Sequence, residues 1–230
     1  MATLRRAFYL GRQKLELGLT LTFPQLPETS RGRYIPPADF DAIVALIPSE
    51  TKRVFCEFAY LTGVRKGQLR WTELANVDTD RWVLSWRPDQ TKSGEPHVLP
   101  LVGRTKEIVQ ALWAQRRLDC RFLFQEEGRP LGELRSEWET ACRAAGFPVG
   151  RKAGGYAFHD TRHSCITNLH SAGVPDSVAM SISNHKTTSV FLRYGIRHES
   201  AQRAALEQVE ALLRDTQDRS TVQPLVPQAI

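Results

Sequence analysis

The segment HDTRHSCITNLH, residues 159–170, places two residues that can act on a phosphate group within a helical hydrophobic pattern. His159 and Arg162 fall on one helical face together with the apolar residues that follow them, so we expect both polar side chains to point inward. Because arginine keeps its positive charge, an inward Arg162 needs an anion or a carboxylate as its partner. The pattern predicts either an anion-binding site or a structural salt bridge with a nearby acidic residue.

Two further basic residues lie at positions from which they could bind an anion. Arg65 follows Gly63, which is expected to end a hydrophobic helix in a left-handed turn, and this fixes the arginine at the edge of the core. Lys92 lies close to Gly94 in a predicted hairpin loop, from which a flexible ammonium group can reach outward. Each of the two, taken alone, is more typical of a solvated surface position.

The segment NHKTTSVFLRYG, residues 184–195, supplies a histidine and a tyrosine. His185 precedes a predicted helix with threonine at its start, and Tyr194 lies at the end of that helix. A tyrosine at a helix end is usually a packing residue with its hydroxyl in water. The same hydroxyl can attack phosphorus when a base or positive surroundings activate it.

Six residues occur together in an order that one known family shares. They are Arg65, Lys92, His159, Arg162, His185 and Tyr194. The segments TGVRKGQL, TKSGEPHVLPL, FHDTRHS and NHKTTSVFLRYG resemble the catalytic domain of the tyrosine recombinase, or phage integrase, family. The resemblance covers residues 37–215.

This resemblance implies a site-specific DNA recombinase or integrase that cleaves and rejoins DNA strands through a 3′-phosphotyrosine, with Tyr194 as the nucleophile. The covalent intermediate conserves the bond, so no ATP, metal or other cofactor is expected. The implied partner is double-stranded DNA, bound by a homotetramer on paired sites. Accessory DNA-bending proteins are candidate partners, and no membrane association is expected. The resemblance also implies a DNA-associated protein of a prokaryotic cytoplasm or a phage.

The resemblance further implies a role for each of the other residues. Arg65 and Arg162 clamp the phosphate, and two guanidiniums can replace metal ions there because each forks charged donors onto the oxygens. Lys92 donates a proton to the leaving 5′-oxygen, and His159 accepts the proton of the tyrosine. His185 hydrogen-bonds the phosphate and orients it.

The sequence departs from the family pattern at two positions. Gln68 stands where the family commonly has Glu after its first arginine, which suggests a neutral hydrogen bond in place of a charged one. Asn184 stands where the family commonly has Gly before its second histidine. Because Asn tolerates a left-handed backbone better than most residues, we expect the turn to survive.

Periodicity predicts the elements that must position these residues. The fold class is mostly α (α+β), a helical domain with a small antiparallel β-sheet at one edge. Two helices are expected between Pro37 and Gly63, with Ser49 capping the second. Strands are expected over residues 81–86, 97–101 and 75–77. Further helices are expected around residues 108–113 and 134–141, then over 159–171, 175–182, 187–194 and 199–214.

The domain organisation follows from proline and charge patterning. Residues 1–22 are expected to be the last helix of a truncated core-binding domain, or alternatively a helix packed on the main domain. Residues 23–36 form a proline-rich linker, residues 37–215 the catalytic domain, and residues 216–230 a flexible tail. The apolar face of the helix over 199–214 either docks on a neighbouring protomer or packs on its own domain.

Composition narrows the class of protein. A net charge of +6 and a pI near 9.3 favour a polyanionic partner without proving one. No apolar run is long enough for a membrane span, and the N-terminus has no signal-peptide core, so the chain is expected to be soluble and unexported. The four cysteines are scattered without a C-x-x-C pair, which favours buried thiols over disulfides or a zinc knuckle.

Three other functions remain open from the sequence. A type IB topoisomerase shares much of the residue set but usually has Lys where this chain has His159. A metal phosphohydrolase would use His159–Asp160 with His163 and His185, but no second acidic ligand accompanies them at helical spacing. A DNA-binding module that kept the fold without activity would not need all six residues.

Overall fold

The computed structural model describes residues 6–11, 33–150, 153–186, 207 and 209–210. Contacts divide the chain into two units, Met1–Ser30 and Arg31–Ile230, and each is considered by itself. In the first unit residues 6–11 are helical, within the helix expected there. The predicted helix over 187–194, most of that over 199–214 and the predicted tail lie outside the described residues.

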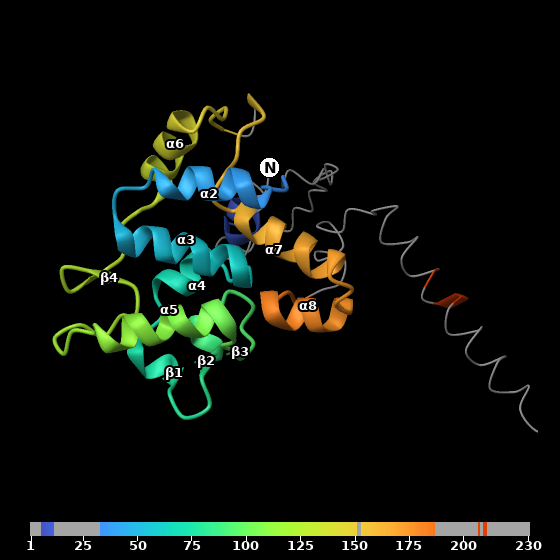
Figure 1. The fold of residues 1–230 in the computed structure, drawn as a ribbon. Coiled ribbons are helices and arrows are strands. Elements are labelled where there is room, and N and C mark those ends of the chain that lie inside the picture. The colour runs from blue at the N-terminus through green and yellow to red at the C-terminus, as the bar shows by residue number, and fades with distance from the viewer. Residues whose placement is uncertain (1–5, 12–32, 151–152, 187–206, 208, 211–230) are drawn as a thin grey trace, which may run out of the picture. The chain divides into compact units, whose positions relative to one another are not determined.

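Helices dominate the described part of the second unit, as Figure 1 shows. The α-helices are α2 (Pro37–Ala45), α3 (Glu50–Thr62), α4 (Lys66–Arg70), α5 (Gly103–Ala114), α6 (Arg135–Ala144), α7 (Asp160–Ser171) and α8 (Asp176–Ser183). Short 3-10 helices cover Leu74–Asn76 (η1) and Pro88–Gln90 (η2). Every helix predicted between residues 37 and 182 is present.

Two small antiparallel sheets accompany the helices. The first has the order β1–β2–β3, with β1 at Val77–Asp78, β2 at Val83–Trp86 and β3 at His97–Pro100. The second pairs β4 (Gln125–Glu126) with β5 (Arg129–Pro130). The predicted fold class, mostly helical with a small antiparallel sheet, is confirmed. The third predicted strand starts two residues later than expected, because η1 occupies the residues before Val77.

Helix α3 begins and ends where its sequence predicts. The Ser49 hydroxyl accepts a hydrogen bond from the Lys52 amide at 3.2 Å, which satisfies one of the unpaired donors of the first turn. Gly63 follows the helix with φ 65°, in the left-handed conformation that favours glycine. The helix therefore stops at a fixed point and releases the chain toward Arg65.

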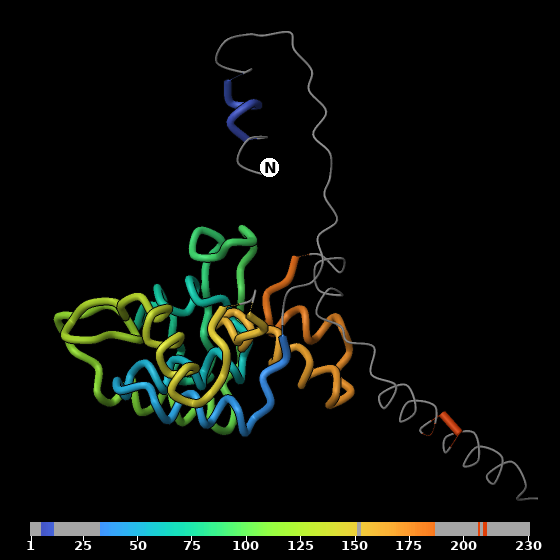
Figure 2. Tube along the Cα trace, turned by 90° about the horizontal axis from the view of Figure 1, so that it is seen from above, coloured from blue at the N-terminus to red at the C-terminus, as the bar shows by residue number. Residues whose placement is uncertain are grey.

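The hydrophobic core surrounds α3. Its Phe55 and Phe58 rings both pack edge-on against Phe124, and Phe55 also stacks on Phe158. Helix α3 packs against α2, α5 and α7, and α8 lies beside α7 in the two views of Figures 1 and 2. Helix α7 is thus enclosed between neighbours, and its residues from Asp160 to Thr167 are all buried. Such a buried helix can hold a charged side chain in one fixed orientation.

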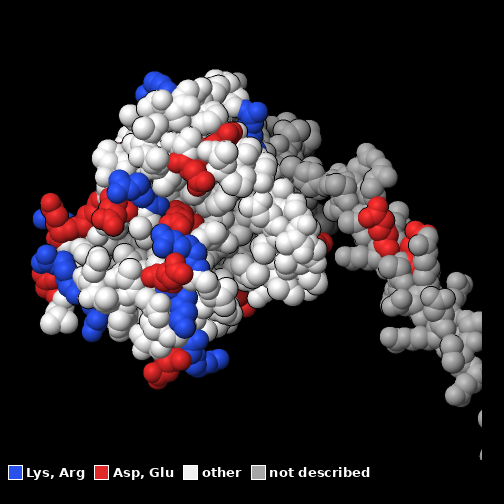
Figure 3. All heavy atoms as spheres, viewed as in Figure 1, with Lys and Arg blue, Asp and Glu red and all other residues white. Residues whose placement is uncertain are grey.

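All four cysteines are buried and free, as predicted. On the face seen in Figure 3, acidic and basic side chains are interspersed without a continuous field of one sign. No helix in the described part of the chain is long and apolar enough to cross a membrane.

Candidate active site

Arg162 lies on α7 and is almost fully buried, with 2% of its surface exposed. Its Nη1 donates to the carbonyl oxygen of Gly63 at 2.6 Å and to that of Ser183. A Cβ on Gly63 would lie 3.2 Å from both Cβ and Sγ of Cys165, so the glycine permits the close packing of α7 against the end of α3. The inward orientation predicted for Arg162 is confirmed, and the end of α3 and the end of α8 hold the guanidinium between them.

His185 contacts the same guanidinium. Arg162 Nη2 lies 2.7 Å from Nε2 of His185 and 2.9 Å from Nδ1. Ser183 Oγ donates to the Ala179 carbonyl at 2.7 Å, so it can only accept at its 2.8 Å contact with Nδ1 of His185. In the tautomer with its proton on Nδ1, the ring donates to Ser183 Oγ and its Nε2 lone pair accepts from Arg162 Nη2.

The surroundings of His185 keep it neutral. Burial, and then the nearby Arg162, Arg65 and His159, lower the pKa of this imidazole from 6.5 to about 3. A neutral His185 can accept a hydrogen bond from Arg162, whereas an imidazolium would repel it. The electrostatics and the hydrogen bonds thus indicate the same protonation state.

Arg65 reaches the same turn from another element. It is the N-cap residue of α4, and its Nη1 donates to the carbonyl oxygen of Asn184 at 2.6 Å. Arg65 and Arg162 lie far apart in the sequence, yet they bind the successive carbonyls of Asn184 and Ser183. Three of the six predicted residues, Arg65, Arg162 and His185, therefore meet at residues 183–185.

Asn184 makes this turn possible. It ends α8 in the left-handed conformation, with φ 52° and ψ 55°, as predicted for the residue that replaces the family glycine. Its Oδ1 accepts a hydrogen bond from Ser93 Oγ at 3.1 Å. The side chain that glycine would lack therefore connects the turn to the loop that carries Lys92.

Lys92 is exposed in the loop between η2 and β3. The part of the loop that follows this lysine is fixed to the site by the contact of Ser93 with Asn184 and by an ion pair of 3.3 Å between Glu95 and Lys186. The structure thus brings the loop to the turn that binds the two arginines. The position of Lys92 agrees with either a solvated lysine or one that reaches toward a bound phosphate.

His159 differs from the expectation. Helix α7 begins at Asp160, so His159 is its N-cap residue and its side chain is exposed instead of pointing inward with Arg162. It still lies close enough to His185 to help lower the pKa of that residue. The prediction of an inward His159 is wrong, while its proximity to the other site residues remains. Tyr194 lies outside the described residues.

The alternative of a metal site finds no support. In the described ranges, no group of three or more His, Cys, Asp or Glu side chains lies close enough to hold an ion. The Asp160 carboxylate accepts backbone amides from Arg33 at 3.3 Å and from Ala157 at 2.7 Å. The Arg162 charge beside His185 also opposes a cation there.

Gln68 makes the neutral hydrogen bond predicted for it. Its Nε2 lies 2.8 Å from Nδ1 of His97, a buried residue at the start of β3. His97 was not singled out in the sequence, although strand alternation places it on the same inward face as Leu99. The alternation of buried and exposed residues along β3 is the sequence feature that could have predicted a buried His97.

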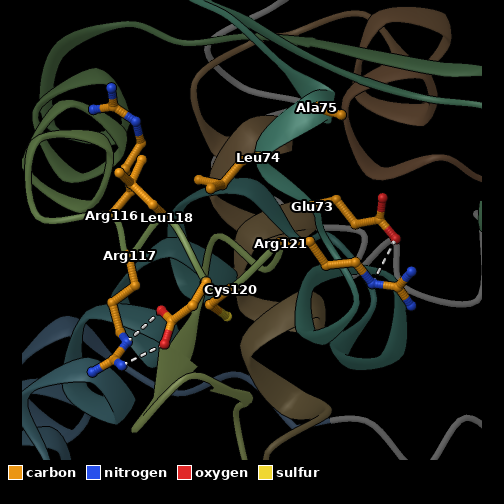
Figure 4. Close-up of a pocket in the computed structure, with 9 residues that line it drawn as sticks. Glu73, Leu74, Ala75, Arg116, Arg117, Leu118, Cys120 and Arg121 are labelled. Atoms are coloured by element: carbon orange, nitrogen blue, oxygen red, sulfur yellow. Dashed lines mark hydrogen bonds and ion pairs between the residues drawn. The ribbon is translucent and has the colours of Figure 1, made fainter.

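A separate pocket lies away from these residues. It is lined by Glu73–Ala75 and Arg116–Arg121, and Figure 4 shows two ion pairs among its side chains. Arg117 binds Asp119 at 2.6 Å, and Arg121 lies 3.5 Å from Glu73. Of the predicted site residues within the described part of the chain, none lines this pocket, so it adds nothing to the candidate site.

The fold and the paired arginines define a class of protein, the catalytic domains of tyrosine recombinases. The described fold is similar to that of a lambda integrase fragment in a dimer bound to a COC′ core site, with a TM-score of 0.63 at 18% identity over 86% of this chain and 72% of that chain. It is also similar to XerA recombinase, with a TM-score of 0.62 at 18% identity over 88% and 73%.

Residues 34–202 match the model of the phage integrase family, and the chain belongs to this family. It is 26% identical over 176 residues to the integrase of Salmonella phage P22, covering 73% of this chain and 44% of that protein. It is 30% identical over 125 residues to the putative integrase/recombinase y4rB of Sinorhizobium fredii (strain NBRC 101917 / NGR234), covering 50% and 39%. The chain thus spans less than half the length of these curated relatives.

Proposed function

We propose that this chain catalyses site-specific cleavage and rejoining of DNA strands through a 3′-phosphotyrosine. Its family membership supports the proposal, as do similar solved structures described as bound to DNA, among them the lambda integrase dimer and the Tn1549 transposon integrase with transposon right end DNA. The single observation that carries it is the convergence of Arg65 and Arg162 on the turn at residues 183–185.

The two arginines can stabilise the transition state of phosphodiester cleavage. Attack of a tyrosine oxygen on phosphorus forms one P–O bond and breaks the bond to the 5′-oxygen, while negative charge builds on the non-bridging oxygens. Each guanidinium carries five N–H donors in a rigid fork, and the carbonyl contacts of Arg65 and Arg162 involve Nη1. Anchoring the fork in this way fixes its orientation before DNA arrives, which is the basis of electrostatic preorganisation.

The remaining roles follow from what each bond requires. Tyr194 supplies the attacking oxygen, and His159 accepts its proton at the exposed rim of the site. Lys92 donates the proton that the leaving 5′-oxygen needs. The exposure of His159 and Lys92 is compatible with these roles, because both must meet the DNA and not the protein core.

His185 has a role that its tautomer defines. With its proton on Nδ1, the ring donates to Ser183 and accepts from Arg162 at Nε2, so in this tautomer it orients the arginine. For His185 to donate to a phosphate oxygen, Nε2 must gain a proton. A bound phosphate favours this, because a nearby negative charge raises the pKa of an imidazole.

The wider assembly is proposed in the same terms. Residues 37–215 form the catalytic domain and residues 1–22 the last helix of a core-binding domain. The active species is a homotetramer on two DNA duplexes, assisted by accessory DNA-bending proteins. Such a DNA-associated protein would work in a prokaryotic cytoplasm. The helix over 199–214 provides the contact to a neighbouring protomer.

A trapping experiment tests the proposal without knowledge of the DNA site. The full chain is incubated with a pool of nicked duplexes whose sequence is randomised around the nick, with the label on the 5′ end of the nicked strand. Cleavage near the nick releases a short fragment, so religation fails and the labelled strand stays attached to the protein. We expect a labelled adduct that survives denaturant.

Two arginine variants make the result specific. Arg162→Ala should lower adduct formation by roughly 10²- to 10³-fold, the usual loss when one transition-state donor is removed. Arg135→Ala is the matched control, because this exposed arginine binds Glu139 on the surface of α6. The absence of any wild-type adduct, or an equal yield from Arg162→Ala, would contradict the proposal. Relaxation of supercoiled plasmid by monomeric chain would favour the topoisomerase alternative.

A further inference from the structure

His97 connects three segments that each carry a predicted site residue. Its Nδ1 lies 2.8 Å from Gln68 Nε2 on α4, the helix that starts after Arg65. Its Nε2 lies 3.1 Å from the carbonyl oxygen of Ile182, near the end of α8 and just before His185. His97 itself begins β3, directly after the loop that carries Lys92. The imidazole is buried, with 3% of its surface exposed.

The hydrogen bonds determine the tautomer of His97. A carbonyl oxygen can only accept, so the contact with Ile182 requires a proton on Nε2. A neutral ring then has a lone pair on Nδ1, which accepts from the Gln68 amide. Turning the amide over would place oxygen against that lone pair, so the orientation of Gln68 follows from that of His97.

The ring is also held from its face. It stacks on Trp86 with the ring centroids 4.9 Å apart and an angle of 16° between the planes. Trp86 Nε1 donates to Thr72 Oγ1 at 3.0 Å, and that hydroxyl donates to the carbonyl oxygen of Gln68 at 3.0 Å. The group Gln68, Thr72, Trp86 and His97 therefore forms a closed set of contacts, called the His97 bridge below.

We propose that His97 is a positioning residue for the phosphate site. Its Nδ1 accepts from Gln68 and its Nε2 donates to Ile182, and these two hydrogen bonds fix the positions of α4, β3 and the end of α8 relative to one another. Arg65, the Lys92 loop and the turn at residues 183–185 are thereby fixed relative to one another. The effect on catalysis rests on the proposed function, whereas the geometry of the bridge does not.

The bridge requires a neutral imidazole, and its surroundings supply that condition. The charged groups that face His97 are Arg65 at the start of α4 and Arg162 on α7, and both disfavour a second positive charge. Burial acts in the same direction and more strongly, and together they lower the pKa of His97 to about 4. A glutamate in place of Gln68 would instead accept from Nδ1 and draw a proton onto it. Gln68 thus matches a neutral His97.

Kinetics with three substitutions test the positioning role. His97→Phe keeps a ring against Trp86 but loses both hydrogen bonds. His97→Asn keeps an acceptor for Gln68, and His97→Gln keeps a donor for Ile182. On a duplex recovered from the trapping pool, we expect His97→Phe to cleave about 10- to 100-fold more slowly at saturating DNA, since a misplacement near 1 Å costs up to this much. The two amide variants should fall between wild type and His97→Phe.

The matched control is Tyr60→Phe, which removes a buried hydrogen bond of 2.9 Å to the Ile35 carbonyl and leaves the hydrogen bonds of the His97 bridge in place. The DNA concentration that gives half-maximal cleavage should stay within about threefold of wild type in all variants, because Arg65 and Arg162 keep their guanidinium donors. If His97→Phe only lowers the melting temperature, as Tyr60→Phe does, and leaves the cleavage rate unchanged, the positioning role is refuted.

Nuclear magnetic resonance tests the bridge even if the chain cleaves no DNA. The side-chain ¹⁵N signals of His97 should show a neutral ring protonated on Nε2 from pH 5.5 to 8. Gln68→Glu should move Nδ1 toward the protonated value in that range, whereas the neutral isostere Gln68→Met should not. His97→Phe should shift the Nε–H signal of Arg65 well beyond the shift in Tyr60→Phe. A wild-type ring protonated on Nδ1, or an unmoved Arg65 signal, would overturn the proposal.

Discussion

Nη2 of Arg162 lies 2.7 Å from Nε2 of His185, and this contact joins the buried part of α7 to the turn that follows α8. The same Nη2 lies 2.9 Å from Nδ1, which also contacts Ser183 Oγ at 2.8 Å, so the guanidinium contacts both nitrogens of the imidazole. The arginine is thereby fixed by two carbonyls and a neutral histidine, without a titratable acid among these three partners. Such an arrangement keeps its geometry across the physiological pH range.

The left-handed turn at Asn184 gives a stability prediction. With φ 52°, a residue with an ordinary side chain costs about 1–2 kcal/mol more than glycine at this position. Asn184→Ala should therefore lower the free energy of unfolding by about 1 kcal/mol relative to Asn184→Gly, measured by urea denaturation. Equal stability of the two variants would show that the turn relaxes. Asn184→Gly also removes the contact with Ser93, so it should loosen the Lys92 loop.

The two buried histidines predict acid sensitivity. The pKa of His97 is about 4 and that of His185 about 3 in the folded domain, both below the ordinary 6.5. As the pH falls, the unfolded chain binds these protons first. The stability they contribute is complete above about pH 6.5 and is lost as the pH falls toward the folded-state values.

The free energy of unfolding should accordingly drop by about 2 kcal/mol between pH 6 and pH 5, as two groups each contribute about 1 kcal/mol over this interval. Urea denaturation at several pH values measures the drop. His97→Phe should halve this drop, because of the two histidines His185 alone then contributes to it. A stability that does not change between pH 7 and pH 5 would show that both imidazoles can take up protons in the folded state.

Metal independence follows from the arginine pair. If Arg65 and Arg162 stabilise the charge on the phosphate oxygens, adduct formation should proceed at the wild-type rate in excess EDTA. The measurement is the yield of covalent adduct with and without chelator. An activity that disappears in EDTA and returns with one divalent metal would assign that charge stabilisation to an ion.

Lys92 can be tested by changing the leaving group. Lys92→Ala should cleave DNA roughly 10²- to 10⁴-fold more slowly, the range for loss of general acid catalysis. Replacing the bridging 5′-oxygen with sulfur gives a leaving group that is stable as an anion, so this substrate should restore the lysine variant. Arg162→Ala should stay defective on it, because the charge on the non-bridging oxygens is unchanged. Failure of sulfur to restore Lys92→Ala would point to phosphate binding as the role of this lysine.

Much of the fold could be predicted because local signals and packing agree. Helix α3 has a serine cap, a hydrophobic face and a terminal glycine, and each of these appears in the structure. The hairpin β4–β5 was not predicted, because two-residue strands show no periodicity. Its turn has positive φ at Glu127 and Gly128, and glutamate is an unusual residue for the first of these positions.

The site was predicted less completely, for physical reasons. Helical periodicity places His159 on the buried stripe of α7, but the helix starts one residue later and His159 is exposed. The carbonyl partners of Arg162 could not be predicted either, since they are the backbone oxygens of Gly63 and Ser183. Every residue has such an oxygen, so the residue type does not show which one will accept. Gln68 and Asn184 could be recognised because they stand where the family commonly has glutamate and glycine. Gln68 makes a neutral hydrogen bond and Asn184 keeps the left-handed turn, as predicted.

The most direct test of the account is to identify the residue that carries the DNA. The adduct trapped from the nicked pool is digested with protease and nuclease, and the peptide that retains a nucleotide is sequenced by mass spectrometry. We predict that the modification lies on Tyr194, joined to a 3′-phosphate, and that Tyr194→Phe forms no adduct because a ring without its oxygen cannot attack phosphorus. A nucleotide on any other residue, or an undiminished adduct with Tyr194→Phe, would contradict the assignment of this site.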